Sequence, residues 1–378
     1  MPLTEPPFTM GVEEEYLVVD KDSRELVQDP SQAVFAQCQE QLGAQVSPEF
    51  LRSQIEVETG ICTSIAELRA DLVRLRKTVA QVTAEHGLAP MAASTHPFSQ
   101  WQSQKHTDKE RYNVLAKDMQ AVARRLVICG MHVHVGIGND ELRIDLMNQV
   151  TYFLPHLLAL STSSPFWLGE KTGLMSYRIS VWDELPRTGL PEHFESYGEY
   201  DRHVAIMTHA GLIEDATKIW WDVRPSGRYP TLELRISDIC TRLDDVVTIA
   251  ALYVCLLRML YRLRRDNQRW RIYSRFLINE NRWRAHRYGI DDGLVDFGKG
   301  QVVPFAQLLE ELIELIAEDI DYFQCAAEIE NARAILKRGT SSHRQIAVYD
   351  EAVAGGAQPQ EALKAVVDML VAETVAGL

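Results

Sequence analysis

Four segments of this chain alternate ionisable with apolar residues, and this alternation constrains the fold more than any other feature of the sequence. Successive side chains of a β-strand point to opposite faces of the sheet, so each segment predicts a strand with one polar and one apolar face. The chain shows no regular β-α-β rhythm, which favours an α+β fold with an antiparallel sheet. The polar faces would carry Glu13 and Glu15, Glu56 and Glu58, His132 and His134, and Glu233 and Arg235.

The density of carboxylates on these polar faces indicates a bound divalent cation. Carboxylates that crowd together repel one another, and burying them without a counter-charge is unfavourable. Any one of the four strands would by itself fit a solvated sheet edge, but all four together favour a metal-centred site. Glu14 falls on the opposite face of the first strand, with Val12 and Tyr16, so we expect its replacement to affect function far less.

The identity of the cation follows from the balance of ligand types. A His-x-His pair on a strand, here His132 and His134, is a spacing that can bind zinc or manganese. A majority of carboxylates favours magnesium or manganese instead. Because carboxylates dominate the predicted face, we expect Mg²⁺, with Mn²⁺ as the alternative.

Arginines near the last of the four strands suggest an anionic ligand. Arg235 shares a face with Glu233, and a guanidinium suits planar, bidentate recognition of phosphate or carboxylate. Arg224 precedes the turn between the last two predicted strands. Arg178 lies in an irregular stretch, 164–200, which is rich in glycine, proline and aromatic residues and is typical of a functional loop. A substrate carboxylate and solvent are equally suitable partners for Arg178.

Charge, cysteine usage and hydropathy limit the class of protein. The 39 basic and 53 acidic residues give a net charge of −14, which argues against a nucleic-acid-binding surface. Six scattered cysteines without a C-x-x-C pair favour the cytoplasm. Residues 1–7 do not resemble a signal peptide. The most apolar segment, 246–260, contains Arg258 and is too short to span a bilayer, so we expect a core helix and no membrane partner.

Helix signals are clearest at Ser64 and Glu67, which have capping-box form and precede a helical apolar series ending at Gly87. Residues 220–222 and 231–238 are expected to form a hairpin. Neither a G-x-x-x-x-G-K-[ST] loop nor a usable G-x-G-x-x-G follows a strand, so a bound nucleotide would have to lie on the polar sheet. Further helices are expected over 31–42 and 108–128, from Asp140 to Leu157 with a kink at Pro155, and over most of the chain after Leu243.

Five segments in order along the chain resemble one family. Taken together they are similar to the bacterial carboxylate–amine ligases of the glutamate–cysteine ligase type 2 family. Each segment alone is weakly specific, whereas five in order, spread over nearly the whole chain, are highly specific. The segments are 9–16, 130–137, 220–226, 231–238 and 280–291.

The resemblance implies a glutamine-synthetase-like fold, in which a curved, mostly antiparallel sheet forms a funnel flanked by helices, in one catalytic domain over 1–378. It implies ATP, Mg²⁺, an amino acid and an amine as ligands, an acyl-phosphate intermediate, and a type reaction that joins glutamate to cysteine. A homo-oligomer would be compatible with such a sheet. The segment 282–287 matches the family without suggesting a role. The residues implied to bind metal are Glu13, Glu15, Glu56, His132 and Glu233, with Glu58 as a weaker candidate. Those implied to bind the nucleotide are His134, Arg224 and Arg235, and those implied to act in catalysis are Arg235 and Glu233. Arg178 and Trp221 are the implied substrate contacts.

Two alternatives stay open at this point. One is a zinc-dependent hydrolase that uses the His132 and His134 pair, which would need further histidine ligands on later strands of a barrel. The other is a non-catalytic member of the ligase fold, whose acidic face would be incomplete.

Overall fold

An antiparallel sheet of seven strands forms the centre of the computed structural model, which describes residues 4–378 apart from the side chains of residues 111, 115, 121 and 124. The first three residues of the segment compared with a signal peptide therefore lie outside the described residues. The strand order is β10-β11-β5-β1-β3-β2, and β4 pairs with the far end of β1. The strands are β1 Met10–Asp20, β2 Val46–Pro48, β3 Gln54–Glu58, β4 Leu88–Met91, β5 Met131–Gly136, β10 Val223–Pro225 and β11 Thr231–Leu234.

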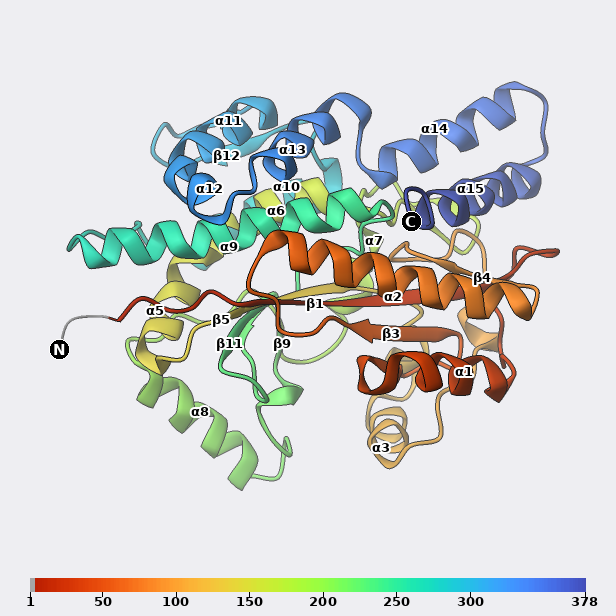
Figure 1. The fold of residues 1–378 in the computed structure, drawn as a ribbon, viewed down its shortest axis with the longest axis horizontal. Helices are drawn as coiled ribbons and strands as arrows, with labels where there is room; N and C mark the ends of the chain where they lie inside the picture. The colour runs from red at the N-terminus through yellow and green to blue at the C-terminus, as the bar shows by residue number, and fades with distance from the viewer. Residues whose placement is uncertain (1–3) are drawn as a thin grey trace.

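Two long helices cover the apolar face of this sheet, α2 (Ile65–Glu85) and α9 (Leu243–Arg265), and Figure 1 shows both lying along it. The apolar stripe of α2 is buried, and its N-cap Ser64 accepts the N–H of Glu67, as the capping signal predicts. Helix α9 extends beyond the predicted 246–260. By length and composition alone it could cross a membrane, but 89% of its most apolar window is buried inside the protein, as in a core helix.

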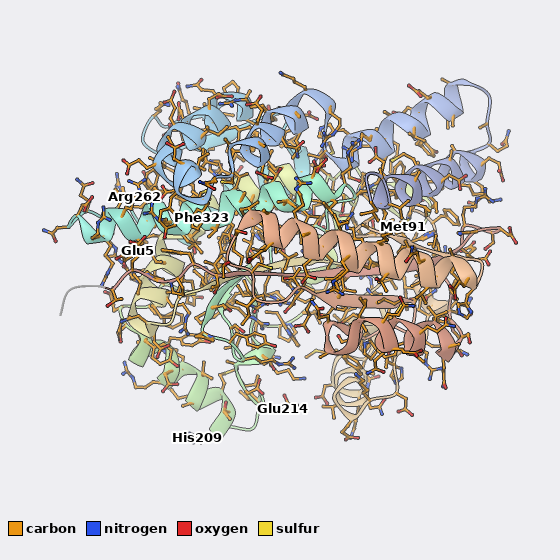
Figure 2. The ribbon with its side chains drawn as sticks, in the orientation of Figure 1. Glu5, Met91, His209, Glu214, Arg262 and Phe323 are labelled. Carbon is orange, nitrogen blue, oxygen red and sulfur yellow. The ribbon has the colours of Figure 1, made fainter. Side chains whose placement is uncertain are left out.

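Helices of the last third of the chain gather beyond α9, whereas α3 and α8 lie on the other side of the sheet (Figure 1). Near the outer end of α9, which Arg262 marks in Figure 2, Arg258 of α9 pairs with Glu5 at 3.1 Å. The remaining helices are α1 Gln32–Leu42, α3 Glu110–Met119, α4 Ala121–Arg124, α5 Asp140–Val150, α6 Leu154–Ser161, α7 Tyr177–Trp182, α8 Tyr197–His209, α10 Arg275–Tyr288, α11 Phe305–Leu315, α12 Ala317–Phe323, α13 Ala326–Arg338, α14 Ser341–Ala354 and α15 Pro359–Thr374.

Three predicted elements differ from the structure. The helix expected over 108–128 divides into α3 and α4 at Gln120, whose φ of 51° cannot continue a helix. The helix expected from Asp140 breaks in a 3₁₀ turn at Thr151–Phe153, just before Pro155. In the hairpin, β10 pairs with β11, whereas β9 (Trp220–Trp221) runs parallel to β8 (Thr188–Gly189).

The irregular stretch 164–200 is ordered by short elements. It contains α7, β8 and the start of α8, together with the small hairpin of β6 (Phe166–Trp167) and β7 (Glu170–Lys171). A further two-stranded hairpin, β12 (Leu294–Asp296) with β13 (Gln301–Val303), follows α10. The stretch 164–200 matters for function, because α7 supplies Trp182 to one wall of the cavity described below.

Candidate functional site

Strand register places the predicted acidic residues in adjacent rows on one face of the sheet. Glu13 of β1 lies opposite Glu58 of β3 on one side and His132 of β5 on the other. Two residues further along β1, Glu15 lies opposite Glu56. The alternation read from the sequence is therefore confirmed for these strands.

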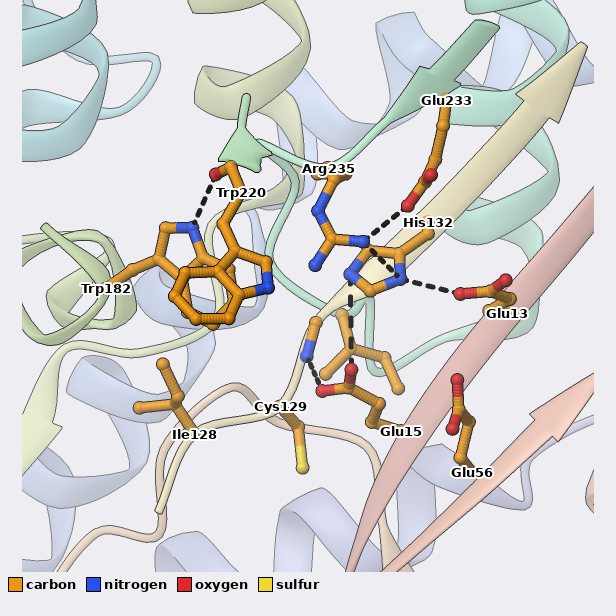
Figure 3. Close-up of polar contacts among 12 residues, drawn as sticks. Glu13, Glu15, Glu56, Ile128, Cys129, His132, Trp182, Trp220, Glu233 and Arg235 are labelled. Atoms are coloured by element: carbon orange, nitrogen blue, oxygen red, sulfur yellow. Dashed lines mark hydrogen bonds and ion pairs between the residues drawn. The ribbon is translucent and has the colours of Figure 1, made fainter. Parts of the chain in front are cut away.

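The other half of the face is built by β5, β11 and β10. Glu233 lies opposite both His134 and Arg224. Arg235 follows the last residue of β11, and its side chain turns back to Glu233 (Figure 3). A cavity of about 350 Å³ opens over both halves, and its walls include Glu13, Glu15, Glu56, Glu58, His132, His134, Arg224, Glu233 and Arg235.

Glu13 is held between the two histidines. Its carboxylate oxygens lie 2.8 Å from Nδ1 of His132 and 3.0 Å from Nε2 of His134. Burial alone would raise the pKa of Glu13, but the hydrogen bonds from the histidines outweigh burial and hold this pKa well below its usual range. Burial and Arg235 lower the pKa of His132, whereas Glu13 and Glu233 overcome burial and raise the pKa of His134.

Glu233 is paired with two arginines. Arg224 donates to both of its carboxylate oxygens, at 2.9 Å from Nε and 3.2 Å from Nη2, and Arg235 forms a close ion pair through Nη1. Burial would raise the pKa of Glu233, but the two guanidinium groups hold it well below the ordinary value. Glu233 therefore stays ionised although only 1% of it is exposed.

Glu56 and Glu58 lack such compensation. Among the residues that the structure describes, no lysine or arginine forms an ion pair with either carboxylate. Glu56 accepts a hydrogen bond from Ser47 at 2.8 Å, but burial and the neighbouring carboxylates Glu49, Glu13 and Glu15 raise its pKa well above the usual value. Burial and Glu13 likewise raise the pKa of Glu58. This half of the cavity therefore concentrates carboxyl groups whose ionised form the surrounding protein disfavours.

One cation could contact both halves of the face. Glu13, His134 and Glu233 each offer a ligand atom, and the three atoms lie within 4.8 Å of one another. The sequence suggested His132 for the metal and His134 for the nucleotide, whereas this geometry groups His134 with the two carboxylates.

Two tryptophans close the opposite wall of the cavity. Trp182 of α7 donates through Nε1 to the carbonyl of Trp220 at 3.2 Å, and its ring lies 5.7 Å from the guanidinium of Arg235 (Figure 3). Trp221, the predicted substrate contact, is not part of the cavity wall and packs against Phe194, with 5.8 Å between ring centroids. Of this dipeptide, Trp220 lines the cavity and Trp221 does not, because neighbouring residues in β9 face opposite ways.

Arg178 is neither solvated nor part of the cavity wall, contrary to both sequence interpretations. It is 2% exposed and donates to the carbonyls of Arg235 at 3.1 Å and Ile236 at 3.3 Å. It packs so closely over Gly130 that a Cβ added there would lie 2.6 Å from Nη2.

Several residues of the cavity wall were missed in the sequence. Lys109 and Lys218 belong to irregular segments or short turns in which no periodicity marks a side chain as inward-facing. Glu49 follows β2 directly, and the register of β2 against β3 would have been needed to place it.

A second cavity of about 480 Å³ adjoins the first. It shares Glu13, Glu58, His134 and Tyr229 with the first cavity. The rest of its wall is mainly glycine and apolar residues, such as Gly60, Ile61 and Ile137.

Comparisons with known proteins agree with this architecture. The model of Glutamate-cysteine ligase family 2 (GCS2) matches residues 9–368. A curated relative from Rhodospirillum rubrum, named "Putative glutamate–cysteine ligase 2", is 62% identical over 380 residues that cover 100% of this chain and 98% of the relative. A relative of the same name from Jannaschia sp. is 54% identical over 363 residues, covering 96% of each chain.

Two solved structures share the fold at low sequence identity. Glutamate–cysteine ligase from Francisella tularensis, in complex with AMP, has a TM-score of 0.67 at 12% identity and covers 100% of this chain and 90% of its own. A bifunctional glutathione synthetase from Pasteurella multocida has a TM-score of 0.66 at 14% identity, covering 97% of this chain and 52% of its own. The predicted α+β, glutamine-synthetase-like fold is thereby confirmed.

Proposed function

This chain belongs to glutamate–cysteine ligase family 2, and on that premise we propose that it joins the carboxylate of an amino acid to an amine, with ATP as the energy source, in the carboxylate-lined cavity. The predicted family and the class of enzyme, a carbon–nitrogen ligase, are confirmed by the family match and the relatives. The zinc hydrolase alternative loses its basis, because among the described residues only His132 and His134 contribute imidazoles to the cavity wall.

The observation that carries the proposal is the division of one cavity into two electrostatic halves. Arg224 and Arg235 supply positive charge beside Glu233, which suits phosphate. Glu56 and Glu58 supply carboxyl groups whose ionised form the protein disfavours, and a bound cation would stabilise that form. A nucleotide triphosphate with a divalent cation complements both halves, whereas a purely anionic or purely cationic ligand complements only one.

The donor set fits Mg²⁺, with Mn²⁺ as the alternative. Glu13, His134 and Glu233 would hold one ion, and Glu15 and Glu56, with Glu58 beside them, would hold another. When bound, the ions would neutralise negative charge on the phosphates and on the reacting carboxylate. His132 keeps a lowered pKa and so stays neutral, which suits it to orient Glu13 through Nδ1 rather than to carry charge.

In the first step, a carboxylate oxygen of the acid attacks the γ-phosphorus of ATP. The bond from that phosphorus to the β,γ-bridging oxygen breaks, which yields an acyl phosphate and ADP. Arg235 would stabilise the charge that moves to the bridging oxygen. Its Nη1 already pairs with Glu233, so the guanidinium is held at the wall of the cavity in which the phosphates would lie.

In the second step, the amine nitrogen attacks the acyl carbon. The carbon–oxygen bond to the phosphate breaks, inorganic phosphate leaves with the electron pair, and the phosphate takes up the proton that the amine loses. Water would destroy the acyl phosphate, and Trp182, Leu185 and Trp220 form an apolar wall that restricts it. The adjoining apolar cavity, which shares His134 with the first, suits the base and sugar of the nucleotide.

The test is ADP formation by purified protein with ATP and Mg²⁺, measured against single amino acids and then against pairs of an amino acid and an amine. Glutamate with cysteine is the first pair, because the relatives carry those names. We expect release of ADP that depends on the acid. No ADP with any pair would contradict the proposal and favour a non-catalytic member of the fold. We also propose a cytoplasmic enzyme acting on small molecules, alone or as a homo-oligomer.

A further inference from the structure

Arg282, in the segment whose role the sequence did not suggest, connects α10 to two aspartates. Its Nε lies 2.6 Å from Oδ2 of Asp222, and its Nη2 lies 3.2 Å from Oδ1 of the same residue. Its two terminal nitrogens also donate to Asp183, at the end of α7, at 2.7 and 2.8 Å. Asp222 is 1% exposed, so this pair is a buried connection rather than a surface contact.

Asp222 in turn holds the backbone of Arg235. Its carbonyl accepts the N–H groups of Arg235 at 2.8 Å and Ile236 at 3.0 Å. Strand β11 ends at Leu234, so Arg235 has left the ladder that fixes Glu233. The position of the arginine therefore depends on contacts from outside the sheet.

The same backbone is held from the other side by Arg178. The side chain of Arg178 donates hydrogen bonds to the carbonyls of Arg235 and Ile236. Arg178 belongs to α7, and hydrogen bonds connect the start of α7 to α10. The carbonyl of His286 accepts the N–H groups of Met175 at 2.9 Å and Ser176 at 3.2 Å, just before α7 begins. Both hydrogen-bonding groups of the Arg235 backbone are thus fixed by elements that α10 anchors.

We propose that Arg282, acting through Asp222, is a positioning residue that aligns Arg235 for phosphoryl transfer, an inference that rests on the proposed function. The reason is geometric. A guanidinium on irregular backbone must be placed within a fraction of an ångström of its productive position, and a displacement of about 1 Å can lower turnover on the order of 100-fold.

The test compares Asp222→Asn with Asp319→Asn, a matched control remote from the cavity. Asp319 is also buried, at 0% exposure, and binds Arg258 at 2.8 Å and Arg262 at 2.7 Å between α9 and α12. Both variants should lower Tm. We expect Asp222→Asn to lower kcat by about 10- to 100-fold while KM for ATP changes less than about threefold, and Asp319→Asn to leave kcat within about twofold.

Arg282→Met supplies a second route to the same break. It also removes the contacts to Asp183, so it should lower kcat at least as much as Asp222→Asn does. The double variant should lose no more than Arg282→Met alone, since the Arg282–Asp222 interaction is already absent from that single variant. Equal kcat in the Asp222→Asn and Asp319→Asn variants would overturn the inference, as would additive losses in the double variant.

A crystal structure of Asp222→Asn separates this inference from the proposed function. We expect the Arg235–Glu233 contact to be lost or displaced there and to be intact in Asp319→Asn. An unchanged contact in Asp222→Asn would overturn the positioning role. A wild-type protein that forms no ADP would contradict the proposed function, and the two crystal structures would still decide whether Arg282 and Asp222 place Arg235.

Discussion

Two buried carboxylate–arginine pairs lie on opposite faces of the same sheet, and they differ in what their remaining hydrogen-bonding groups do. On the helix-covered face, Arg76 contacts both carboxylate oxygens of Glu14. Its guanidinium also donates hydrogen bonds to the carbonyls of Cys240, Thr241 and Thr374. On the cavity face, Glu233 binds two arginines, yet Nε of Arg235 has no partner among the described residues. The fully hydrogen-bonded pair of Arg76 and Glu14 stabilises the fold, whereas Glu233 and its two arginines line the cavity in which we propose that the ligand binds.

The first prediction breaks the pair on the helix-covered face. Glu14→Gln leaves the charge of Arg76 buried without a counter-ion, so we expect a loss of about 3–5 kcal/mol in the free energy of unfolding. Denaturant unfolding of the wild type and the variant measures this loss. The folded fraction should keep kcat within a few-fold, because Glu14 faces away from the cavity. A turnover defect as large as that of the next variant would mean that the two faces are not independent.

The second prediction breaks the pair on the cavity face. Glu233→Gln keeps the shape of the side chain but removes the charge that holds Arg235, and we expect ADP formation to fall on the order of 100-fold or more at saturating Mg²⁺. Its stability loss should be smaller than that of Glu14→Gln, because the cavity admits water to the stranded arginines. Near-normal turnover would contradict the role assigned to Glu233.

The third prediction concerns the uncompensated half of the cavity. Because the pKa of Glu56 is raised in the folded state, its ionised form lowers stability at neutral pH, and this penalty disappears as pH falls to the unfolded pKa near 4.3. In the presence of EDTA at pH 7–8, Glu56→Gln should therefore raise Tm by roughly 2 °C. The gain should shrink on acidification, whereas Glu233→Gln should lower Tm under the same conditions. A lower Tm for Glu56→Gln would show that its charge is already balanced.

The fourth and smallest effect tests the aromatic wall. Trp220→Leu removes a ring from the cavity, and we expect KM for the acid or the amine to rise roughly fivefold with little change in kcat. Trp221→Leu is the matched control and should leave both constants near wild type. The reverse order of effects would restore the contact that the sequence suggested.

Periodicity was sufficient to predict the strands and the face on which each acidic residue lies. Once a strand is recognised, its period of two fixes the face to which every side chain points. It placed Glu14 on the covered face but could not reveal its ion pair, since Arg76 is 62 residues away in sequence. The same limit explains Arg178 and Arg282. Their partners are backbone groups or aspartates on other elements, and nothing local in the sequence indicates tertiary contacts of that kind.

The distinction between His132 and His134 also needed the fold. Both lie on the polar face of β5, and only the pairing of β5 with β11 shows that His134 is the one opposite Glu233. The sequence also could not show which of Trp220 and Trp221 faces the cavity. Their strand has two residues, which is too short for an alternating pattern to indicate which face each side chain occupies.

The close fit of Arg178 over Gly130 has a consequence for redesign of this enzyme. A methyl group at residue 130 would reach Nη2 of Arg178 at 2.6 Å and Nε2 of His132 at 3.2 Å without entering the ligand space. Mutagenesis of this neighbourhood to alter substrate choice should therefore keep this glycine. One added carbon there would displace Arg178, and with it the backbone of Arg235 that Arg178 holds.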